Sequence, residues 1–292
     1  MKRPPLQLEQ LDAWLEARET RYEDLRDDSH ARIVWQGGER RRRTFSIVYL
    51  HGFSASPMEV APFCERLAGP LYANVYYPRL TGHGRSAEAM DEGSAEAWLD
   101  DAHEAATIGR RIGERVILVG TSTGGTLATL LAASGRIPEL AAVILIAPNF
   151  GLVDGRSFLL GLPAARRWIH WLVGRERVIE AEHPDHARYW TLRYGTHTLV
   201  AMYRLVRRVQ RVVMERLDVP MLAIFSDSDQ VVAAKRTRSM LARAPDAEIM
   251  VVPDSGSGNR HVVIGDAFGA EHTDAAVDRS LAFLADRGIT VD

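Results

Sequence analysis

Short blocks of apolar residues alternate with longer amphipathic stretches along most of this chain. The apolar blocks have the length of strands, and several are rich in Val and Ile on both faces, as the central strands of parallel sheets are. The pattern predicts strands over residues 31–35, 45–50, 74–77, 116–119, 142–147, 221–225 and 248–252.

The stretches between these strands place apolar residues at the spacing of one helical face. Ser94 and Thr273 stand where helix caps belong, and Pro57 stands where a first helical turn begins. Strands that alternate with helices favour βαβ units and a mostly parallel sheet. Gly37 and Gly38 link the first two strands, so we expect an antiparallel hairpin at that edge. The predicted helices cover 6–26, 56–68, 95–112, 123–134, 233–243 and 273–287.

The interval 151–218 breaks this alternation, because it separates two predicted strands by far more than one crossover helix. It carries several Trp and Tyr residues among apolar ones, whereas a linker would be rich in Gly, Ser and Pro or charged throughout. We therefore expect a helical cap or lid over 151–218, inserted between two parts of one core at 31–150 and 219–292. Residues 1–30 would then form a helical N-terminal extension.

Composition narrows the class of protein. The 292 residues are 46% hydrophobic and 25% charged, which is the balance of an ordinary globular protein. The net charge of −2 is small and negative, so the protein as a whole does not attract nucleic acid. A single cysteine allows no intrachain disulfide. No secretory signal is visible, and the longest apolar runs are too short to span a bilayer. We expect a cytoplasmic protein without a transmembrane segment, and the oligomeric state stays open.

The candidate nucleophile lies in the segment Gly-Thr-Ser-Thr-Gly, which has the pattern G-x-S-x-G with Ser122 at its centre. A predicted strand precedes the motif and a predicted helix follows it, which is the setting of a nucleophile elbow. The helix N-terminus would place its free N–H groups beside an oxygen that becomes negative. A phosphate-binding loop is excluded, because no Gly-Lys-Ser/Thr sequence is present.

A nucleophilic serine needs a base, and the base needs an acid that orients it. His261 lies in a Gly- and Ser-rich loop just beyond the last predicted strand, and Asp229 follows the strand before it. The chain order Ser122, Asp229, His261 is the order of α/β-hydrolases. Asp227 is the rival acid; we favour Asp229 because it lies later in its loop, directly before two valines.

Four further segments strengthen a resemblance to the serine α/β-hydrolases of the bacterial carboxylesterase and monoacylglycerol-lipase type. Tyr-Leu-His-Gly-Phe at 49–53 resembles the family's oxyanion loop, and Thr-Gly-His-Gly-Arg-Ser at 81–86 its GHGxS loop. Trp-Leu-Asp-Asp at 98–101 resembles its W-x-x-D segment, and the loops of Asp229 and His261 resemble its acid and base loops. The family often has Gly where Ser226 or Asp227 stands, and often Gly directly before the histidine, where this chain has Arg260. Neither departure removes a reacting group.

The resemblance covers about residues 31–287 and implies the α/β-hydrolase fold, with a mostly parallel central sheet flanked by helices and a helical lid inserted late in the chain. It also implies an esterase of the EC 3.1.1 type, which acts through an acyl-enzyme. Ser122 would attack a carbonyl carbon, His261 would move the proton, and Asp229 would orient His261. The amide N–H groups of Phe53 and Thr123 would form the oxyanion hole.

Ser122, His261 and Asp229 alone do not determine which substrate is cleaved. Carboxylic esters of short or medium acyl chains are the first candidates, with monoacylglycerols among them, and no cofactor or metal is required. An acyl-thioesterase, a lactonase and a non-catalytic binding protein on this fold are the alternatives. Haloalkane dehalogenases and epoxide hydrolases use a carboxylate at the elbow, where this chain has Ser122.

Several other polar residues are weighed against this assignment. His51 and His83 lie in loops near the predicted site and are better explained as hydrogen-bonded scaffold than as acid–base groups. His183 and His186 have a spacing that suits a metal, but no third ligand is in register. The interval 151–218 contains twelve Arg, no Lys and seven acidic residues. Four of its arginines share one helical face, which predicts either a solvated surface or a contact with an anionic lipid or substrate: Arg204, Arg207, Arg208 and Arg211.

Overall fold

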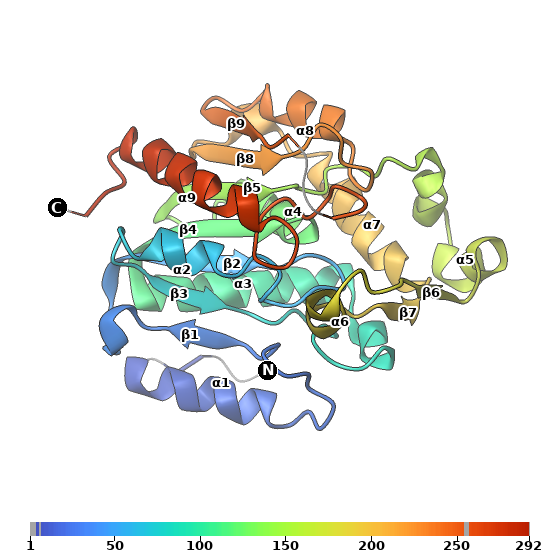
Figure 1. Cartoon of the computed structure of the whole chain (residues 1–292), viewed down its shortest axis with the longest axis horizontal. Helices are drawn as coiled ribbons and strands as arrows, with labels where there is room; N and C mark the ends of the chain where they lie inside the picture. The colour runs from blue at the N-terminus through green and yellow to red at the C-terminus, as the bar shows by residue number, and fades with distance from the viewer. Residues whose placement is uncertain (1–3, 6, 254–256, 292) are drawn as a thin grey trace.

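A seven-stranded sheet forms the centre of the computed structural model, which describes residues 4–5, 7–253 and 257–291 (Figure 1). The strands follow the order β1-β3-β2-β4-β5-β8-β9, and every neighbouring pair except β1 and β3 is parallel. All seven predicted strands are present, within a few residues of their expected ends. They are β1 (Arg32–Val34), β2 (Arg43–Leu50), β3 (Asn74–Tyr77), β4 (Gly113–Thr121), β5 (Leu140–Ile146), β8 (Met221–Phe225) and β9 (Ala247–Val251).

The predicted hairpin between the first two strands is wrong. The edge strand β1 is antiparallel, as expected, but it pairs with β3 and not with β2. β2 already has a parallel neighbour on each side, β3 and β4, so β1 cannot pair with it and instead joins the sheet at the outer edge of β3. Gly37 and Gly38 form the end of the short helix η2 (Gln36–Gly38), which turns the chain away from β1.

Helices cover both faces of the sheet, which confirms the predicted layered architecture (Figure 1). α2 and α9 pack on one face, and α1, α3, α4, α7 and α8 contribute to the core on the other. The best-predicted helix is α3, where the Ser94 hydroxyl accepts a hydrogen bond from the Ala97 amide and caps the N-terminus. The helices are α1 (Leu11–Glu19), α2 (Phe63–Ala68), α3 (Ala95–Ile112), α4 (Thr123–Ala133), α7 (Thr198–Val209), α8 (Ala234–Leu241) and α9 (Ala270–Ala285).

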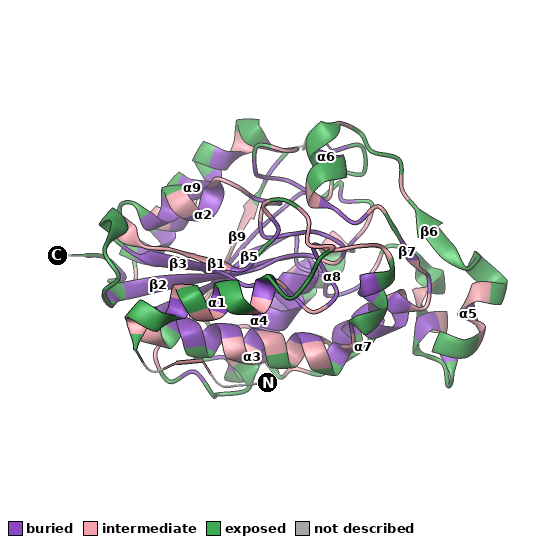
Figure 2. Cartoon of the chain, turned by 90° about the horizontal axis from the view of Figure 1, so that it is seen from below, coloured by how far each residue is buried: buried purple, intermediate pink, exposed green. Residues whose placement is uncertain are grey.

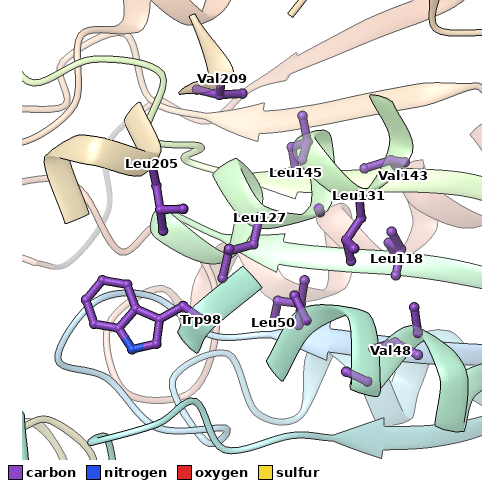
Figure 3. Packing of buried hydrophobic residues seen from close by; sticks show 14 of the residues in the cluster. Val48, Leu50, Trp98, Leu118, Leu127, Leu131, Val143, Leu145, Leu205 and Val209 are labelled. Carbon is purple, nitrogen blue, oxygen red and sulfur yellow. The ribbon is translucent and has the colours of Figure 1, made fainter. Parts of the chain in front are cut away.

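Alternate residues of the central strands supply the two halves of the core. On β2, Val48 and Leu50 face α3 and α4, while Ile47 and Tyr49 face α2 and α9. Figure 3 shows the first of these layers, where the strand residues meet Leu127 and Leu131 of α4 and Leu205 of α7, among others. Fully burying one such aliphatic side chain is worth about 1.5–3 kcal/mol, so these layers hold the sheet rigid behind the loops at its carboxyl edge.

The N-terminal segment is tied to the body of the molecule. Leu11 and Leu15 of α1 are buried in the core, and the Glu19 carboxylate forms a largely buried ion pair with Arg79, 2.7 Å between Oε2 and Nε. Arg26 donates a hydrogen bond of 2.6 Å to the carbonyl oxygen of Trp190, far along the chain. The predicted helix over 6–26 is shorter than expected, because the chain turns after Glu19 to make these contacts.

The interval between β5 and β8 contains more than helices. It holds α5 (Ala165–Val173), α6 (Pro184–Tyr189) and α7, the short helices η4 (Gly155–Gly161) and η5 (Met214–Arg216), and a small hairpin of β6 (Glu176–Val178) and β7 (Arg193–Gly195). The hairpin was not predicted, since three-residue strands leave no clear apolar pattern. α5 and β6 project at one end of the molecule and are exposed over much of their length (Figure 2).

Candidate active site

Ser122 lies at a sharp turn between β4 and α4. Its backbone angles are φ 52° and ψ −114°, a conformation that side-chain-bearing residues rarely adopt. Hydrogen bonds hold the turn from both sides. The Ser122 amide donates to the carbonyl oxygen of Ile146 at 2.9 Å, and the Ser122 carbonyl accepts from the amides of Asn149 at 2.9 Å and Thr126 at 3.1 Å. These contacts fix the strained turn that carries the hydroxyl beyond the edge of the sheet.

Two glycines of the motif are required by close packing. A Cβ atom on Gly120 would collide with the carbonyl oxygen of Gly124, and one on Gly124 would collide with the carbonyl oxygen of Leu50 at the end of β2. The turn can therefore form only where these positions lack side chains. The spacing G-x-S-x-G follows from this crowding, which explains why the motif is informative in its strand–turn–helix context.

Ser122, His261 and Asp229 form one hydrogen-bonded chain. His261 Nε2 lies 2.9 Å from Ser122 Oγ, and His261 Nδ1 lies 2.7 Å from Asp229 Oδ2. The Asp229 side chain is 1% exposed and that of His261 is 12% exposed, so the acid is shielded from solvent behind the imidazole. The structure thus brings together three residues that the sequence places at strand ends far apart in the chain.

The two candidate acids have different surroundings. Asp229 Oδ1 accepts hydrogen bonds from the amides of Val231 at 2.7 Å and Val232 at 2.8 Å, which leaves Oδ2 for His261. Asp227 instead forms an exposed ion pair with Arg238, which lowers the pKa of the Asp227 carboxyl. The geometry favours Asp229 over Asp227 as the partner of the imidazole.

Phe53 and Thr123 both lie beside the nucleophile. Thr123 is the first residue of α4, whose first N–H groups have no acceptor within the helix. The loop before Phe53 passes against Ser122: a Cβ atom on Gly52 would lie 3.4 Å from the Ser122 Cβ. Phe53, Ser122 and Thr123 line the same cavity, as the assignment of an oxyanion hole requires.

His51 and His83 are buried parts of the loop framework. The Leu80 amide donates to His51 Nε2 at 3.1 Å, so Nδ1 carries the proton and donates to the Gly52 carbonyl at 2.9 Å. Burial lowers the pKa of His51 to about 4, and it lowers the pKa of His83 well below its usual value. Both rings are therefore neutral near pH 7, and neither contacts Ser122 in the way that His261 does.

The W-x-x-D segment holds the GHGxS loop in place. Trp98 Nε1 donates to the Thr81 carbonyl at 2.8 Å, and the Thr81 amide donates to Asp101 Oδ2 at 2.7 Å. One peptide group on each side of Thr81 is thus fixed by α3. Burial raises the pKa of Asp101 to about 6.

Glu59 is a buried residue near the site that sequence reasoning missed. Its side chain lies beneath the loop of Gly52, where Oε1 accepts hydrogen bonds from the Gly52 amide and from the Tyr49 hydroxyl, the latter at 2.7 Å. Burial raises the pKa of Glu59 to about 7. The signal in the sequence is one acidic residue in an otherwise apolar or neutral stretch from Gly52 to Pro62.

A cavity of about 700 Å³ opens in front of Ser122 and His261. Most of its wall is apolar and comes from residues of the interval 151–218. The aliphatic side chains of this wall include Leu152, Leu160, Ile169, Leu172, Leu199 and Met202.

The remaining candidates have structural explanations. His183 accepts a hydrogen bond from the His186 amide at Nδ1 and caps α6. Among the described residues, no group of three or more His, Cys, Asp or Glu could hold a metal ion. On the arginine face of α7, Arg208 forms an ion pair with Glu96, while Arg204, Arg207 and Arg211 are exposed. No helix in the described part of the chain is long and apolar enough to cross a membrane.

The chain is also similar in sequence to known proteins. Residues 42–264 match the family model described as serine aminopeptidase, S33. The thermostable monoacylglycerol lipase of Bacillus sp. (strain H-257) is 27% identical over 188 residues, which cover 64% of this chain and 71% of that protein.

Solved structures show the same fold at low sequence identity. The structure reported for the metagenome-derived lipolytic enzymes LipS and LipT has a TM-score of 0.69 at 19% identity, and covers 90% of this chain and 99% of that chain. The monoacylglycerol lipase of Paleococcus ferrophilus has a TM-score of 0.63 at 16% identity, with 87% and 98% covered. The predicted α/β-hydrolase fold is confirmed.

Proposed function

Because the chain belongs to the S33 serine aminopeptidase family and is an α/β hydrolase of the lipase and esterase type, we propose that it cleaves carboxylic esters of short or medium acyl chains through an acyl-enzyme. Monoacylglycerols are included among these esters, since the curated relative is a monoacylglycerol lipase. The observation that carries the proposal is the hydrogen-bonded chain of Ser122, His261 and Asp229 at the wall of an apolar cavity.

The proposed reaction begins at Ser122. His261 Nε2 takes the hydroxyl proton as Oγ attacks the carbonyl carbon. The Nδ1–H group of the ring keeps its hydrogen bond to the Asp229 carboxylate, which stabilises the imidazolium. The oxyanion of the tetrahedral intermediate accepts hydrogen bonds from the amides of Phe53 and Thr123, each worth about 10²–10³ in rate. His261 then protonates the leaving alcohol, and a water molecule repeats the sequence on the acyl-enzyme.

The cavity supports an acyl chain as the occupant. An aliphatic wall favours an alkyl group, at about 0.8 kcal/mol for each methylene that leaves water. The interval 151–218 supplies much of this wall, so we propose that it acts as a lid over the acyl group. The two parts 31–150 and 219–292 then form the catalytic core, with 1–30 as an extension that packs against it.

Replacing the nucleophile tests the proposal. Ser122→Ala should abolish hydrolysis of p-nitrophenyl butyrate, because loss of a nucleophile costs many orders of magnitude in kcat. A fluorophosphonate probe should label the native chain at Ser122 alone, as mass spectrometry of peptides would report. Labelling at another serine, or a variant that keeps more than about a tenth of kcat, would contradict the assignment.

A substrate panel separates the ester from its alternatives. It should contain p-nitrophenyl esters, monoacylglycerols, acyl-CoA thioesters, lactones and an aminoacyl p-nitroanilide, which the family's name suggests. We expect the highest kcat/KM for an ester. A clear preference for a thioester, a lactone or the anilide would keep the acyl-enzyme but change the substrate class, and no turnover of any member would favour a binding protein on this fold.

A further inference from the structure

The structure exposes an unusual share of its large apolar side chains in one place. Of twelve such exposed side chains among the described residues, seven lie within residues 153–178, on or beside η4, α5 and β6. Trp171 is 78% exposed, the largest value of the set. Apolar side chains that are exposed singly need no explanation, whereas a group of them on neighbouring elements points to a binding site, and α5 packs against η4. The seven are Val153, Phe158, Leu162, Trp171, Leu172, Val173 and Val178.

Positive charge surrounds this surface, which we call the α5 surface. Between residues 153 and 178 the sequence has five arginines and two acidic residues, although the whole chain has a net charge of −2. Both acidic residues are already paired, Asp154 with Arg156 and Glu176 with Arg193. Within the described part of the chain, neither Arg167 nor Arg175 forms an ion pair. Their charge is therefore free to attract an anionic partner.

The arrangement on α5 matches a helix that lies flat on an interface. Ala165 and Ile169 point into the protein and are buried, while Arg167 and Trp171, four residues apart, share the outward face. A helix with apolar aromatic side chains beside arginines on its outward side is typical of peripheral lipid binding. Leu172 is both exposed and part of the wall of the Ser122 cavity, so the α5 surface continues into the proposed site.

We propose that η4, α5 and β6 form a docking surface for anionic lipid. The aromatic side chains of Phe158 and Trp171 enter the boundary between headgroups and acyl chains, and Arg167 and Arg175 contact the anionic headgroups. Docking in this way turns the opening of the cavity toward the lipid. Charge complementarity and continuity with the cavity favour a lipid surface over a second copy of this chain, which would bring the same arginines together.

Vesicle flotation tests the docking surface without any turnover. The native chain should float with phosphatidylcholine vesicles that contain about a third of phosphatidylglycerol, and much less with pure phosphatidylcholine, with a bound fraction that falls as salt rises. Phe158→Ser with Trp171→Ser should lower the bound fraction at least fivefold, and Arg167→Gln with Arg175→Gln should remove most of the salt dependence. None of these four residues lines the Ser122 cavity, so hydrolysis of dissolved p-nitrophenyl butyrate should be unchanged.

Matched controls lie at the other end of the molecule. Val291→Ser removes a 41% exposed apolar side chain near the C-terminus, which is far from α5 in Figure 1, and Arg41→Gln with Arg42→Gln removes the same charge as the arginine pair. These variants should float like the native chain. Equal flotation of the native chain and the Phe158/Trp171 variant would overturn the proposal. So would a dimer in sedimentation that the same variant dissolves. Since the readout is binding, this proposal can fail while the proposed hydrolysis stands.

A second, independent observation concerns Glu59, whose carboxylate is buried beside the site. It is 2% exposed and links three parts of the structure. Oε1 accepts from the Gly52 amide, and the Tyr49 hydroxyl that also bonds Oε1 lies 2.9 Å from Thr121 Oγ1, next to the nucleophile in sequence. The proposed oxyanion loop and the end of β4 are thus joined through one carboxylate.

We infer that Glu59 is a positioning residue for the oxyanion hole. Its Oε1 atom holds the N–H of the His51–Gly52 peptide, and His51 Nδ1 holds the carbonyl of the next peptide, whose N–H is that of Phe53. Glu59 thus fixes the backbone on one side of Gly52 and limits the directions in which the Phe53 amide can point. A preorganised donor stabilises the transition state only when it is aimed at the oxyanion, so a loosened loop costs kcat more than KM. This inference rests on the proposed function, because it assigns Glu59 a part in that mechanism.

Three variants of Glu59 test this role against p-nitrophenyl butyrate. Glu59→Gln keeps an acceptor oxygen and should keep kcat within about threefold, whereas Glu59→Ala should lower kcat by about 10–100-fold with little change in KM. Glu59→Leu also lacks the acceptor but fills the space, so it serves if the alanine variant fails to fold. Affinity for a boronic acid transition-state analogue should fall with kcat/KM across the series.

Other outcomes would overturn the inference. Full kcat in both Glu59→Ala and Glu59→Leu would do so, as would a loss confined to KM. A folded Glu59→Gln as inactive as Glu59→Ala would show that the charge matters and the acceptor does not. Failure of the proposed function itself would appear earlier, as a native chain without esterase activity or a Ser122→Ala variant that retains it.

Discussion

Two aspartates follow β8, and their contacts differ enough for a test at the scale of single residues. Asp229→Asn should lower kcat by about 10³–10⁴, because the imidazolium loses its charged partner and the ring is no longer held in the tautomer with the proton on Nδ1. Asp227→Asn is the matched control: it breaks only an exposed ion pair with Arg238 and should keep kcat within about twofold. Steady-state kinetics on p-nitrophenyl butyrate measure both, and the reverse order of effects would assign the acid to Asp227.

The pKa of Glu59 predicts a pH dependence of stability. Burial raises this pKa to about 7 in the folded chain, above its ordinary value near 4.5. The folded state therefore binds the proton more tightly than the unfolded state. The contribution of Glu59 to stability is complete below about pH 4.5 and is lost as the pH rises through about 7. Its size is on the order of 3 kcal/mol.

Glu59→Gln should remove this dependence, because an amide does not titrate. Urea unfolding at pH 5 and pH 8 gives the free energy of unfolding of both proteins. The contribution of Glu59 is the change between these pH values in the native chain, minus the same change in the variant. We expect the native chain to lose more stability than the variant over this interval. An equal change in both would mean that Glu59 does not titrate between these pH values.

The predictability of the site also differs from residue to residue. Ser122, Asp229 and His261 could be proposed together from the sequence because each follows a strand, and the carboxyl ends of parallel strands meet at one edge. Glu59 could not be found in this way. Its role depends on a loop that folds back over its own start, so that residue 59 lies under residue 52. No periodic pattern of apolar and polar residues predicts such a contact.

At the scale of elements, the turn between β4 and α4 gives the sharpest test of packing. Gly124→Ala should destabilise the fold by about 3 kcal/mol or more, or prevent folding, because the new methyl group collides with the main chain at the end of β2. Gly155→Ala is the control, since nothing lies within 4 Å of its added Cβ. Thermal unfolding of the two variants measures the difference. A Gly124→Ala variant as stable as Gly155→Ala would show that the two elements can move apart.

The pairing of β1 shows where element-level prediction ends. Its apolar run identified a strand, and its edge position was expected, but its partner is decided by which sheet edge remains free. β2 is enclosed by β3 and β4, so β1 reaches past its sequence neighbour. The hairpin of β6 and β7 was missed for a different reason: most of its residues are exposed or half-buried, so burial leaves no alternating pattern in the sequence.

For the whole molecule, the proposed cavity predicts how activity depends on the acyl chain. Each added methylene should raise kcat/KM about threefold to fourfold until the cavity is full, after which the rate should fall. A series of p-nitrophenyl esters from acetate to dodecanoate measures this. Leu199→Phe, which adds bulk to the cavity wall, should move the optimum to a shorter chain, while Val213→Ser, outside the cavity, should leave it in place. Equal rates on acetate and octanoate would remove the acyl-pocket interpretation.

The order of these residues along the chain also matters during synthesis on the ribosome. Ser122 and His261 are 139 residues apart, so a ribosome that adds about 5–20 residues per second makes the serine about 7–28 s before the histidine. The central strands β2 and β4 both come early in the chain and can pair during that interval. A nascent chain therefore holds its serine without a base, and it becomes able to attack an ester only when its last segments have been synthesised.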